Sequence, residues 1–318
     1  MTTAKIICDS TNWLGKRLTT YVLEYPRYIH AELMTHRVFS KNSASSRAIP
    51  IEKFIKVVQD NPVLPIWTEN QKGMQGPPIT DEAQLDVLNS IWMEGRDSAV
   101  DYAQQLEGAL AHKQNINRIL EPWFHIKIVL TGTEFDNWFL LRDHPDAQPE
   151  IQELARVMKR EYEISVPNLL APGQWHVPFG DNIDEMELRS SVGLIMSMNT
   201  SERRYGVEHL KISVARCARV SYNNFDGTSD PIKDIELYEK LVVAEPLHAS
   251  PAEHQARVPT MEEVRGRHLD SSWFSSITSY PLEDRPDEWD AIHRHGKYMS
   301  NLYGWIQLRK LIECGEFA

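Results

Sequence analysis

The chain has 318 residues, of which 42% are hydrophobic and 25% are charged, and these values are ordinary for a globular protein. Its formal net charge of −11 argues against binding to a nucleic acid polymer, since such binding normally needs a basic face. No apolar run approaches the roughly 20 residues that cross a bilayer, and the N-terminus lacks a signal-peptide pattern. The composition therefore predicts a globular protein that acts away from membranes.

The segment 17–39 begins with apolar residues among threonines, which predicts a strand, and it turns helical after Pro26. Serines and Asn42 then end the helix, so the polar stretch 30–50 is predicted to be a loop that follows a helix. Residues 61–80 are rich in Pro, Gly and Gln and are typical of an irregular connection.

Two helices and a strand are predicted next. Residues 80–110 carry apolar side chains at helical spacing, namely Leu85, Leu88, Trp92, Ala99, Tyr102, Leu106 and Leu110. The β-branched run at 125–135 predicts a buried strand. Residues 149–162 predict a helix with Pro149 in its first turn. Its apolar stripe consists of Ile151, Leu154, Ala155 and Met158.

The C-terminal half gives weaker signals. Residues 163–210 are predicted to be loop-rich, and a helix is predicted from about Pro231 with Asp230 as its N-cap. A final short helix is expected at 303–313. Because we find no repeat and no linker, we predict one α/β (α+β) domain over 1–318, with a helical excursion at about 61–115.

Cysteines and histidines give little sign of metal or disulfide chemistry. Cys8, Cys217 and Cys314 are odd in number and far apart, which predicts no disulfide framework and a reducing, cytoplasmic setting. His248 and His254 lie six positions apart, but no clear third ligand accompanies them. We therefore predict no metal site.

The motifs of the commonest nucleotide-binding and hydrolytic sites are absent. No G-x-G-x-x-G follows a strand, and P-loop, H-E-x-x-H and G-x-S-x-G patterns are missing. What remains is a set of arginines in polar loops, at Arg47, Arg118 and Arg142. Arg142 follows an apolar run, which favours a partly buried guanidinium that needs an anion or carbonyl partner. Guanidinium presents parallel donors that suit a phosphate or a pyrimidine edge, although solvated arginines in a serine-rich turn remain the alternative.

Two segments carry a resemblance to a known family. Residues 35–47, "THRVFSKNSASSR", resemble the R-H-R-x-x-S-x-N-E-x-S-x-R signature of the flavin-dependent thymidylate synthases. Residues 131–151, "TGTEFDNWFLLRDHPDAQPEI", are similar to the family segment N-x-R-S-L-x-N-F-L-x-L-R-x-x-x-x-A-Q-x-E-I. Five positions depart from these patterns: Thr35, Ser43, Thr131, Thr133 and Asp146.

Two further blocks stand in an unexpected order. "CARVSYNN" at 217–224 and "LHASPAEH" at 247–254 are similar to A-R-V-S-Y and H-x-[ST]-P-F-E-H, which precede the signature in the family but follow it here. This order implies a circularly permuted branch, with the family's mixed sheet and flanking helices. Segments 173–179 and 301–310 lie outside the shared blocks, and their aromatic residues either stack on a ring or fill a core.

The resemblance implies reductive methylation of dUMP to dTMP. Methylene-tetrahydrofolate (5,10-methylenetetrahydrofolate) would be the carbon donor, and NADPH would reduce a bound FAD. The family's active sites form between the subunits of a homotetramer, so an oligomer is implied. The departures keep two alternatives open: a related one-carbon transferase, such as a hydroxymethylase of a pyrimidine deoxynucleotide, and a non-catalytic nucleotide- or flavin-binding relative.

The same resemblance implies roles for particular residues. Arg142 would be catalytic, stabilising negative charge at the pyrimidine edge. The substrate would be held by Glu32, Ser45, Ser46, Arg47, Arg118 and Arg142. The flavin would contact His36, Arg37, Ser43, Asn137, Ser250 and Glu253. For Ser250 and Glu253, a helix cap is the alternative. Cys217 is expected to be a packing residue, because the implied reaction needs no cysteine nucleophile.

Overall fold

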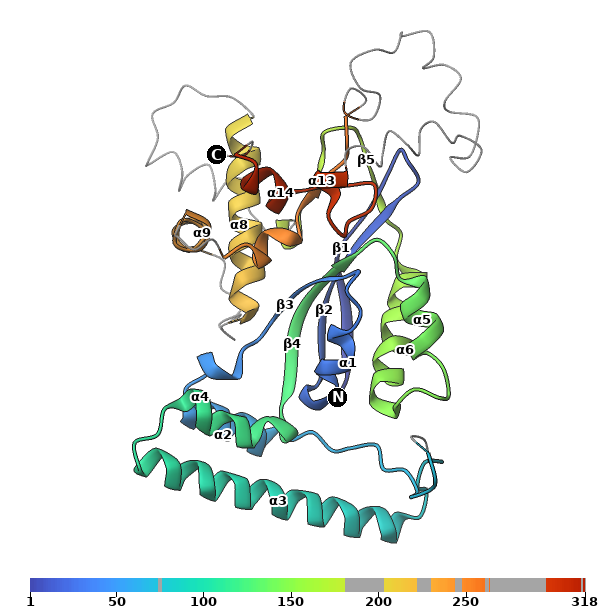
Figure 1. The fold of residues 1–318 in the computed structure, drawn as a ribbon, viewed down its shortest axis with the longest axis vertical. Coiled ribbons are helices and arrows are strands. Elements are labelled where there is room, and N and C mark those ends of the chain that lie inside the picture. The colour runs from blue at the N-terminus through green and yellow to red at the C-terminus, as the bar shows by residue number, and fades with distance from the viewer. Residues whose placement is uncertain are drawn as a thin grey trace.

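The computed structural model describes residues 1–73, 76–180, 203–221, 230–243, 248–260, 263, 296–315 and 317 (Figure 1). Two predicted features lie partly outside these ranges, namely the loop-rich region at 163–210 and the two C-terminal sequence blocks. Within the described ranges, we find no helix with the length and apolar character needed to span a membrane.

A mixed five-stranded sheet lies at the centre, in the order β3-β4-β2-β1-β5 (Figure 1). Its strands are β1 (Thr3–Asn12), β2 (Arg17–Pro26), β3 (Ser40–Ser43), β4 (His125–Gly132) and β5 (Asn168–Leu170). Only β5 runs parallel to its neighbour, β1, and the other neighbouring pairs are antiparallel. The predicted mixed sheet with flanking helices is therefore confirmed.

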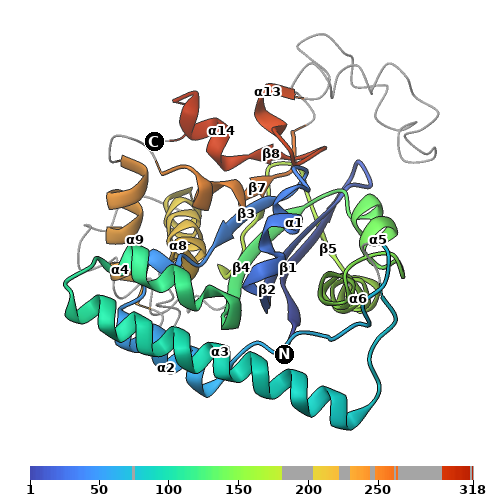
Figure 2. The same ribbon diagram turned by 60° about the horizontal axis from the view of Figure 1, so that its bottom comes forward.

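Helices cover both faces of the sheet, and α5 (Asp136–Arg142) and α6 (Pro149–Ile164) lie on the face opposite α8 (Arg203–Ser221) (Figures 1 and 2). Strand β4 serves both faces, because successive side chains of a strand point to opposite sides. Ile128 and Leu130 belong to the large core with α6, whereas Val129 packs in a smaller cluster with Cys217 of α8. Cys217 is buried, so its predicted packing role is confirmed.

The polar stretch 30–50 is more regular than predicted. It begins with α1 (His30–Met34), which follows the short turn η1 (Arg27–Ile29), and it ends with η2 (Ser46–Ala48). Between them, β3 pairs with β4 from Ser40 to Ser43. The prediction of a continuous loop is wrong here, because pairing with a buried neighbour strand outweighs the low strand propensity of serine, lysine and asparagine.

One long helix, α3 (Glu82–Gly108), crosses the end of the sheet (Figures 1 and 2). Around it lie α2 (Ile51–Asp60), α4 (Lys113–Ile116) and η3 (Asn117–Trp123). The helix itself is confirmed, but the predicted apolar stripe is partly wrong. Tyr102 is 61% exposed and Leu110 is 92% exposed, whereas the small residues Ala99 and Ala103 are buried.

The C-terminal half packs beside α8. Its elements are α9 (Pro231–Tyr238), η5 (Glu239–Val243), η6 (Ser250–Glu253), α13 (Gly296–Met299) and α14 (Leu308–Glu313). A second sheet has the order β6-β7-β8, formed by Trp175–His176, Ala256–Arg257 and Ile306–Gln307. The Asp230 N-cap is confirmed, since its carboxylate accepts from the Ile232 and Lys233 amides. Helix α14 starts later than predicted because β8 pairs with β7.

Candidate active site

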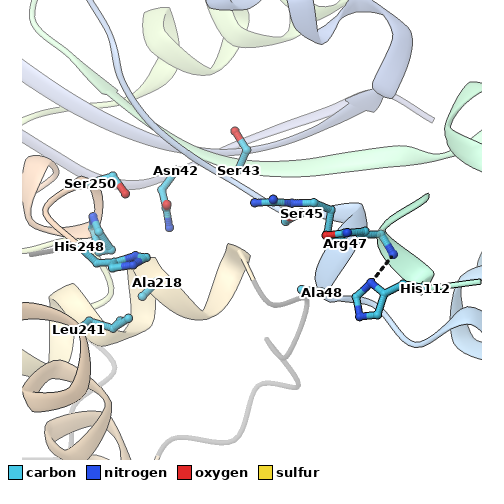
Figure 3. A pocket seen from close by; sticks show the side chains of 12 residues that line it. Asn42, Ser43, Ser45, Arg47, Ala48, His112, Ala218, Leu241, His248 and Ser250 are labelled. Carbon is cyan, nitrogen blue, oxygen red and sulfur yellow. Dashed lines mark hydrogen bonds between the residues drawn. The ribbon is translucent and has the colours of Figure 1, made fainter. Parts of the chain in front are cut away.

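A cavity of about 350 Å³ lies beside strand β3 (Figure 3). Four predicted site residues line it: Ser43, Ser45, Arg47 and Ser250. Asn42, His112 and His248 line it as well. Figure 3 shows Ser250 and His248 on one side of the cavity, Asn42 and Ser43 in the middle, and Ser45, Arg47 and His112 on the other side.

The polypeptide places these side chains by a short strand and a tight turn. Ser43 ends β3, Ser45 precedes η2, and Arg47 lies within η2. The buried amide of Asn42 donates to the Cys217 carbonyl over 2.6 Å and so joins β3 to α8. Ala218, one residue later, lines the same cavity. The walls from β3 and α8 are therefore fixed relative to one another by a buried hydrogen bond.

The charge of the cavity favours an anion. The residues that line it include no aspartate or glutamate. Arg47 is exposed and forms no ion pair with any residue in the described ranges. A guanidinium beside two serine hydroxyls can bind a phosphate through several charge-assisted hydrogen bonds. The volume is at the low end of the roughly 300–1,000 Å³ of small-molecule pockets, which suits a mononucleotide better than a dinucleotide.

Ser46 and Arg118, which are predicted to bind substrate, both donate to one carboxylate in the structure. The Ser46 hydroxyl donates to Glu121 Oε1 over 2.6 Å, and Arg118 donates to the same oxygen over 2.8 Å. Neither residue lines the cavity. The Ser46 contact joins η2 to η3, whereas Arg118 and Glu121 both lie within η3.

A second group of predicted residues surrounds Arg142, the last residue of α5. Its Nε donates to His36 Nε2 over 3.0 Å. The His36 ring is 8% exposed and meets Trp138 edge-on at a centroid distance of 4.8 Å. Burial, and then the positive charge of Arg142, lower the pKa of His36. The imidazole is therefore neutral at pH 7, and its Nε2 accepts the hydrogen bond from the Arg142 guanidinium.

The remaining predicted residues Glu32, Arg37 and Asn137 do not line the cavity. Arg37 and Asn137 are exposed neighbours of His36 and Trp138. Glu32, in α1, has a carboxylate oxygen that is buried without a hydrogen-bond partner in the described part of the chain. Helices α5 and α8 lie on opposite faces of the sheet (Figures 1 and 2). Arg142 is the last residue of α5, whereas Ala218 of α8 lines the cavity.

Three residues at positions where the family contacts the flavin form hydrogen bonds or ion pairs within the chain. Glu253 forms an ion pair with Arg309 of α14. The Thr131 hydroxyl is buried between Thr20 Oγ1 and His254 Nδ1, each at 2.8 Å. Thr133 accepts from the Tyr303 amide over 3.2 Å. The predicted flavin residues thus form two groups: Ser43 and Ser250 line the cavity beside β3, whereas His36 contacts Arg142.

Sequence reasoning missed three of the residues that line the cavity. His248 belongs to the "LHASPAEH" block, so a motif marks its position although it predicts no role for the side chain. His112 precedes α4 and accepts from the Gln114 amide; no motif marks it. Asn42 matched the family signature but was not assigned a role. In the described ranges, no cluster of histidine, cysteine, aspartate and glutamate could hold a metal ion.

The C-terminal blocks meet the signature in space. The Cys217 carbonyl accepts a hydrogen bond from Asn42, which lies 175 positions away in the sequence. Ser250 and Ser43 line the same cavity. Residues 222–224 and 247 of these blocks lie outside the described ranges. The blocks therefore converge on one site, while circular permutation itself stays a prediction.

Comparison with known proteins gives a family match for part of the chain. Residues 17–168, just under half of the chain, match the family described as thymidylate synthase complementing protein. No curated protein matches the chain. Among solved structures, the chain is similar to one described as a UMP/dUMP methylase PolB from Streptomyces cacaoi bound with 5-Br UMP. That likeness has 13% identity and a TM-score of 0.42, and it covers 51% of this chain and 88% of the other.

Proposed function

We propose that this chain, whose residues 17–168 match the thymidylate synthase complementing protein family, is an enzyme that transfers a one-carbon group to a pyrimidine deoxynucleotide. The observation that carries the proposal is the cavity in which Ser43, Ser45 and Arg47 meet without an acidic neighbour among its lining residues. The reaction favoured by the family resemblance is methylation of dUMP to dTMP. Methylene-tetrahydrofolate would donate the carbon, and NADPH would supply the reducing equivalents.

In this proposal the cavity binds the nucleotide phosphate. Arg47 provides two parallel N–H donors, and the Ser45 hydroxyl adds a third donor from the same turn. Each hydrogen bond to a charged group contributes about 1.5–3 kcal/mol. His248 and Ser250 lie across the cavity (Figure 3), where they would contact the sugar or the base.

Arg142 acts on the nucleotide of a second copy in this proposal. His36 holds only the Nε of Arg142, and both Nη groups lack a partner among the described residues. A guanidinium that is oriented by a neutral imidazole and half-exposed can pair with the pyrimidine edge of a substrate bound elsewhere. Because α5 lies across the sheet from the cavity (Figure 2), that substrate would belong to another subunit. A homo-oligomer, a tetramer by resemblance, follows from this arrangement.

The family's FAD would lie between the same two copies. Ser43 and Ser250 of one copy would hold it together with His36, Arg37 and Asn137 of the other. A bound flavin supplies hydride chemistry that no side chain provides. The chain contributes the position of the nucleotide and the charge of Arg142.

A product analysis tests the proposal. Purified protein is incubated with dUMP, methylene-tetrahydrofolate, NADPH and FAD, and the nucleotide is analysed by mass. A product heavier by a methyl group is expected. A hydroxymethyl product would instead support the related transferase. That alternative is favoured by Thr131 and Thr133, whose hydroxyls are engaged within the chain where the family has polar flavin contacts. No modified nucleotide, together with no binding of dUMP, would overturn both readings.

A further inference from the structure

A second and larger cavity, of about 680 Å³, opens between the loop around residues 65–78, helix α3 and the start of α6. We call it the α3–α6 cleft. It shares no lining residue with the cavity beside β3. The proposed nucleotide chemistry therefore makes no use of it.

Aromatic rings form two walls of the cleft at a right angle. Trp67 and Trp92 have an interplanar angle of 84° and a centroid distance of 6.1 Å. The Trp67 indole N–H donates to Asn89 Oδ1 over 2.8 Å, and that of Trp92 donates to the Val63 carbonyl over 2.7 Å. Both rings are thus held in place by their N–H groups, and the Trp92 ring also packs against Trp123 at a centroid distance of 5.2 Å. The π surface that these contacts leave uncovered is what the indoles offer to a ligand.

A buried carboxylate adds negative charge to this corner. Glu150 lies in the first turn of α6 and is 4% exposed. Its Oε1 accepts from the Tyr28 hydroxyl over 3.0 Å and from the Ile66 amide over 2.9 Å. Burial, and then the nearby Glu150, raise the pKa of Tyr28, so the phenol remains a neutral donor. Among the residues that the structure describes, Glu150 has no cationic partner.

The charge of Glu150 is therefore only partly compensated. Two neutral donors and the N-terminal end of α6 stabilise it, but a buried carboxylate without a cation carries a desolvation cost. The cation that lines the cleft is Arg156, which is exposed and donates to Asp143 over 3.1 Å. Asp143 also accepts from Lys159 over 3.3 Å, so these two cations share one carboxylate. The buried charge that lines the cleft is that of Glu150.

We infer that the α3–α6 cleft binds a small organic ammonium ion. Perpendicular aromatic faces attract a cation through their quadrupoles, and such cages recognise alkylated ammonium groups. The carboxylate of Glu150 supplies the opposite charge, and the prolines that line the cleft, Pro65, Pro122 and Pro149 among them, contact the alkyl groups. The net charge of −11 raises the local concentration of cations.

The first test separates charge from shape. The intact protein is titrated with choline and, in parallel, with 3,3-dimethylbutan-1-ol, the neutral isostere that replaces the nitrogen by carbon. Ionic strength is kept constant, and binding is followed by broadening of the ligand methyl resonances in NMR spectra. We expect choline to bind about tenfold more tightly than the alcohol, the difference that a desolvated cation–π contact gives. Equal affinities would overturn the proposal.

The second test uses variants of one helix. Glu150→Gln keeps an oxygen that accepts from Tyr28 and Ile66 but removes the charge, so choline affinity should fall about tenfold. Glu163→Gln, an exposed change at the other end of α6, is the matched control and should bind as the wild type does. Trp67→Leu removes one aromatic wall and should weaken choline binding even if Glu150→Gln fails to fold. Choline affinity unchanged in Trp67→Leu or in folded Glu150→Gln would contradict the inference.

Discussion

At the scale of single residues, the site depends on which arginines already have a partner. Arg47 lines the cavity beside β3 without an ion pair in the described ranges, whereas Arg118 is held by Glu121. The motif could predict Ser43, Ser45, Arg47 and Ser250 because it reports residue types at fixed spacing. It could not predict that Ser46 and Arg118 both donate to Glu121, because Glu121 lies 75 positions from Ser46 in the sequence.

This difference gives a prediction about nucleotide affinity. Arg47→Ala should weaken dUMP binding by about ten- to a hundredfold, since it removes charge-assisted hydrogen bonds of about 1.5–3 kcal/mol. Arg118→Ala, the matched control, should change affinity less than about threefold, because its guanidinium is already paired at a half-exposed site. Isothermal titration calorimetry measures both. A larger loss in Arg118→Ala than in Arg47→Ala would restore the role implied by the motif.

At the scale of elements, the sequence predicted the helices correctly. It did not predict which face of α3 is buried, or that the polar segment 40–43 is a strand. Helix α3 is confirmed over Glu82–Gly108, yet it packs through small residues such as Ala99 and Ala103 rather than through Tyr102. Small side chains let helices approach closely, and a count of large apolar residues does not detect this. Strand β3 has the sequence "SKNS" and forms because β4 pairs with it. Tertiary pairing of this kind leaves no local signal.

The contact between β3 and α8 gives a prediction about stability. Asn42→Ala should lower the free energy of unfolding by about 1–3 kcal/mol, because the buried Cys217 carbonyl loses its side-chain donor. The control Ser43→Ala alters the next, half-buried residue of the same strand and should cost no more than about 0.5 kcal/mol. Urea denaturation of both variants provides the comparison. Equal losses would show that the Asn42 amide has no special part in joining β3 to α8.

At the scale of the whole molecule, a buried polar chain crosses the sheet towards the C-terminal half. The His176 ring contacts Ser10 Oγ and Thr20 Oγ1, each at 2.8 Å. Thr20 continues to Thr131, and Thr131 to His254. Burial lowers the pKa of His176 and that of His254 to about 3, from the ordinary value of 6.5. Both rings are therefore neutral in the folded protein.

The two buried histidines predict that the protein loses stability as the pH falls below about 6.5. Below pH 6.5, His176 and His254 become protonated in the unfolded chain. In the folded protein the same two rings stay neutral until the pH is near 3. Stability is thus fully present above pH 6.5 and falls as pH decreases, by about 1.4 kcal/mol per pH unit for each ring. Denaturation between pH 6.5 and 5 should show this slope. His254→Gln should reduce the slope by the share of one ring, about 1.4 kcal/mol per pH unit, since His30, whose pKa burial lowers to about 4, also contributes. The exposed control His144→Gln should leave the slope unchanged. An unaltered slope in His254→Gln would contradict the assignment.

The separation of Arg47 from Arg142 gives a prediction about assembly. Each alanine variant should be inactive alone, because each removes one half of every site. Hybrid oligomers of Arg47→Ala and Arg142→Ala should recover about a quarter of the activity, since random pairing of symmetric subunits leaves that share of sites intact. Hybrids of Arg47→Ala with Ser45→Ala, whose residues share one wall of the cavity, should recover none. Activity that stays absent in the first mixture would place both arginines in one chain's site.

The bond from Asn42 to Cys217 also bears on how the protein matures. The two residues are 175 positions apart, and Ser250 is among the residues that line the cavity, so the ribosome must release most of the chain before the pocket is complete. Contacts of such long separation form slowly, because loop closure costs entropy before the contact repays it. A nascent chain that carries the complete signature at 35–47 would therefore have no affinity for nucleotide. Stalled chains ending shortly before and shortly after residues 248–251 would show binding begin only with the longer product.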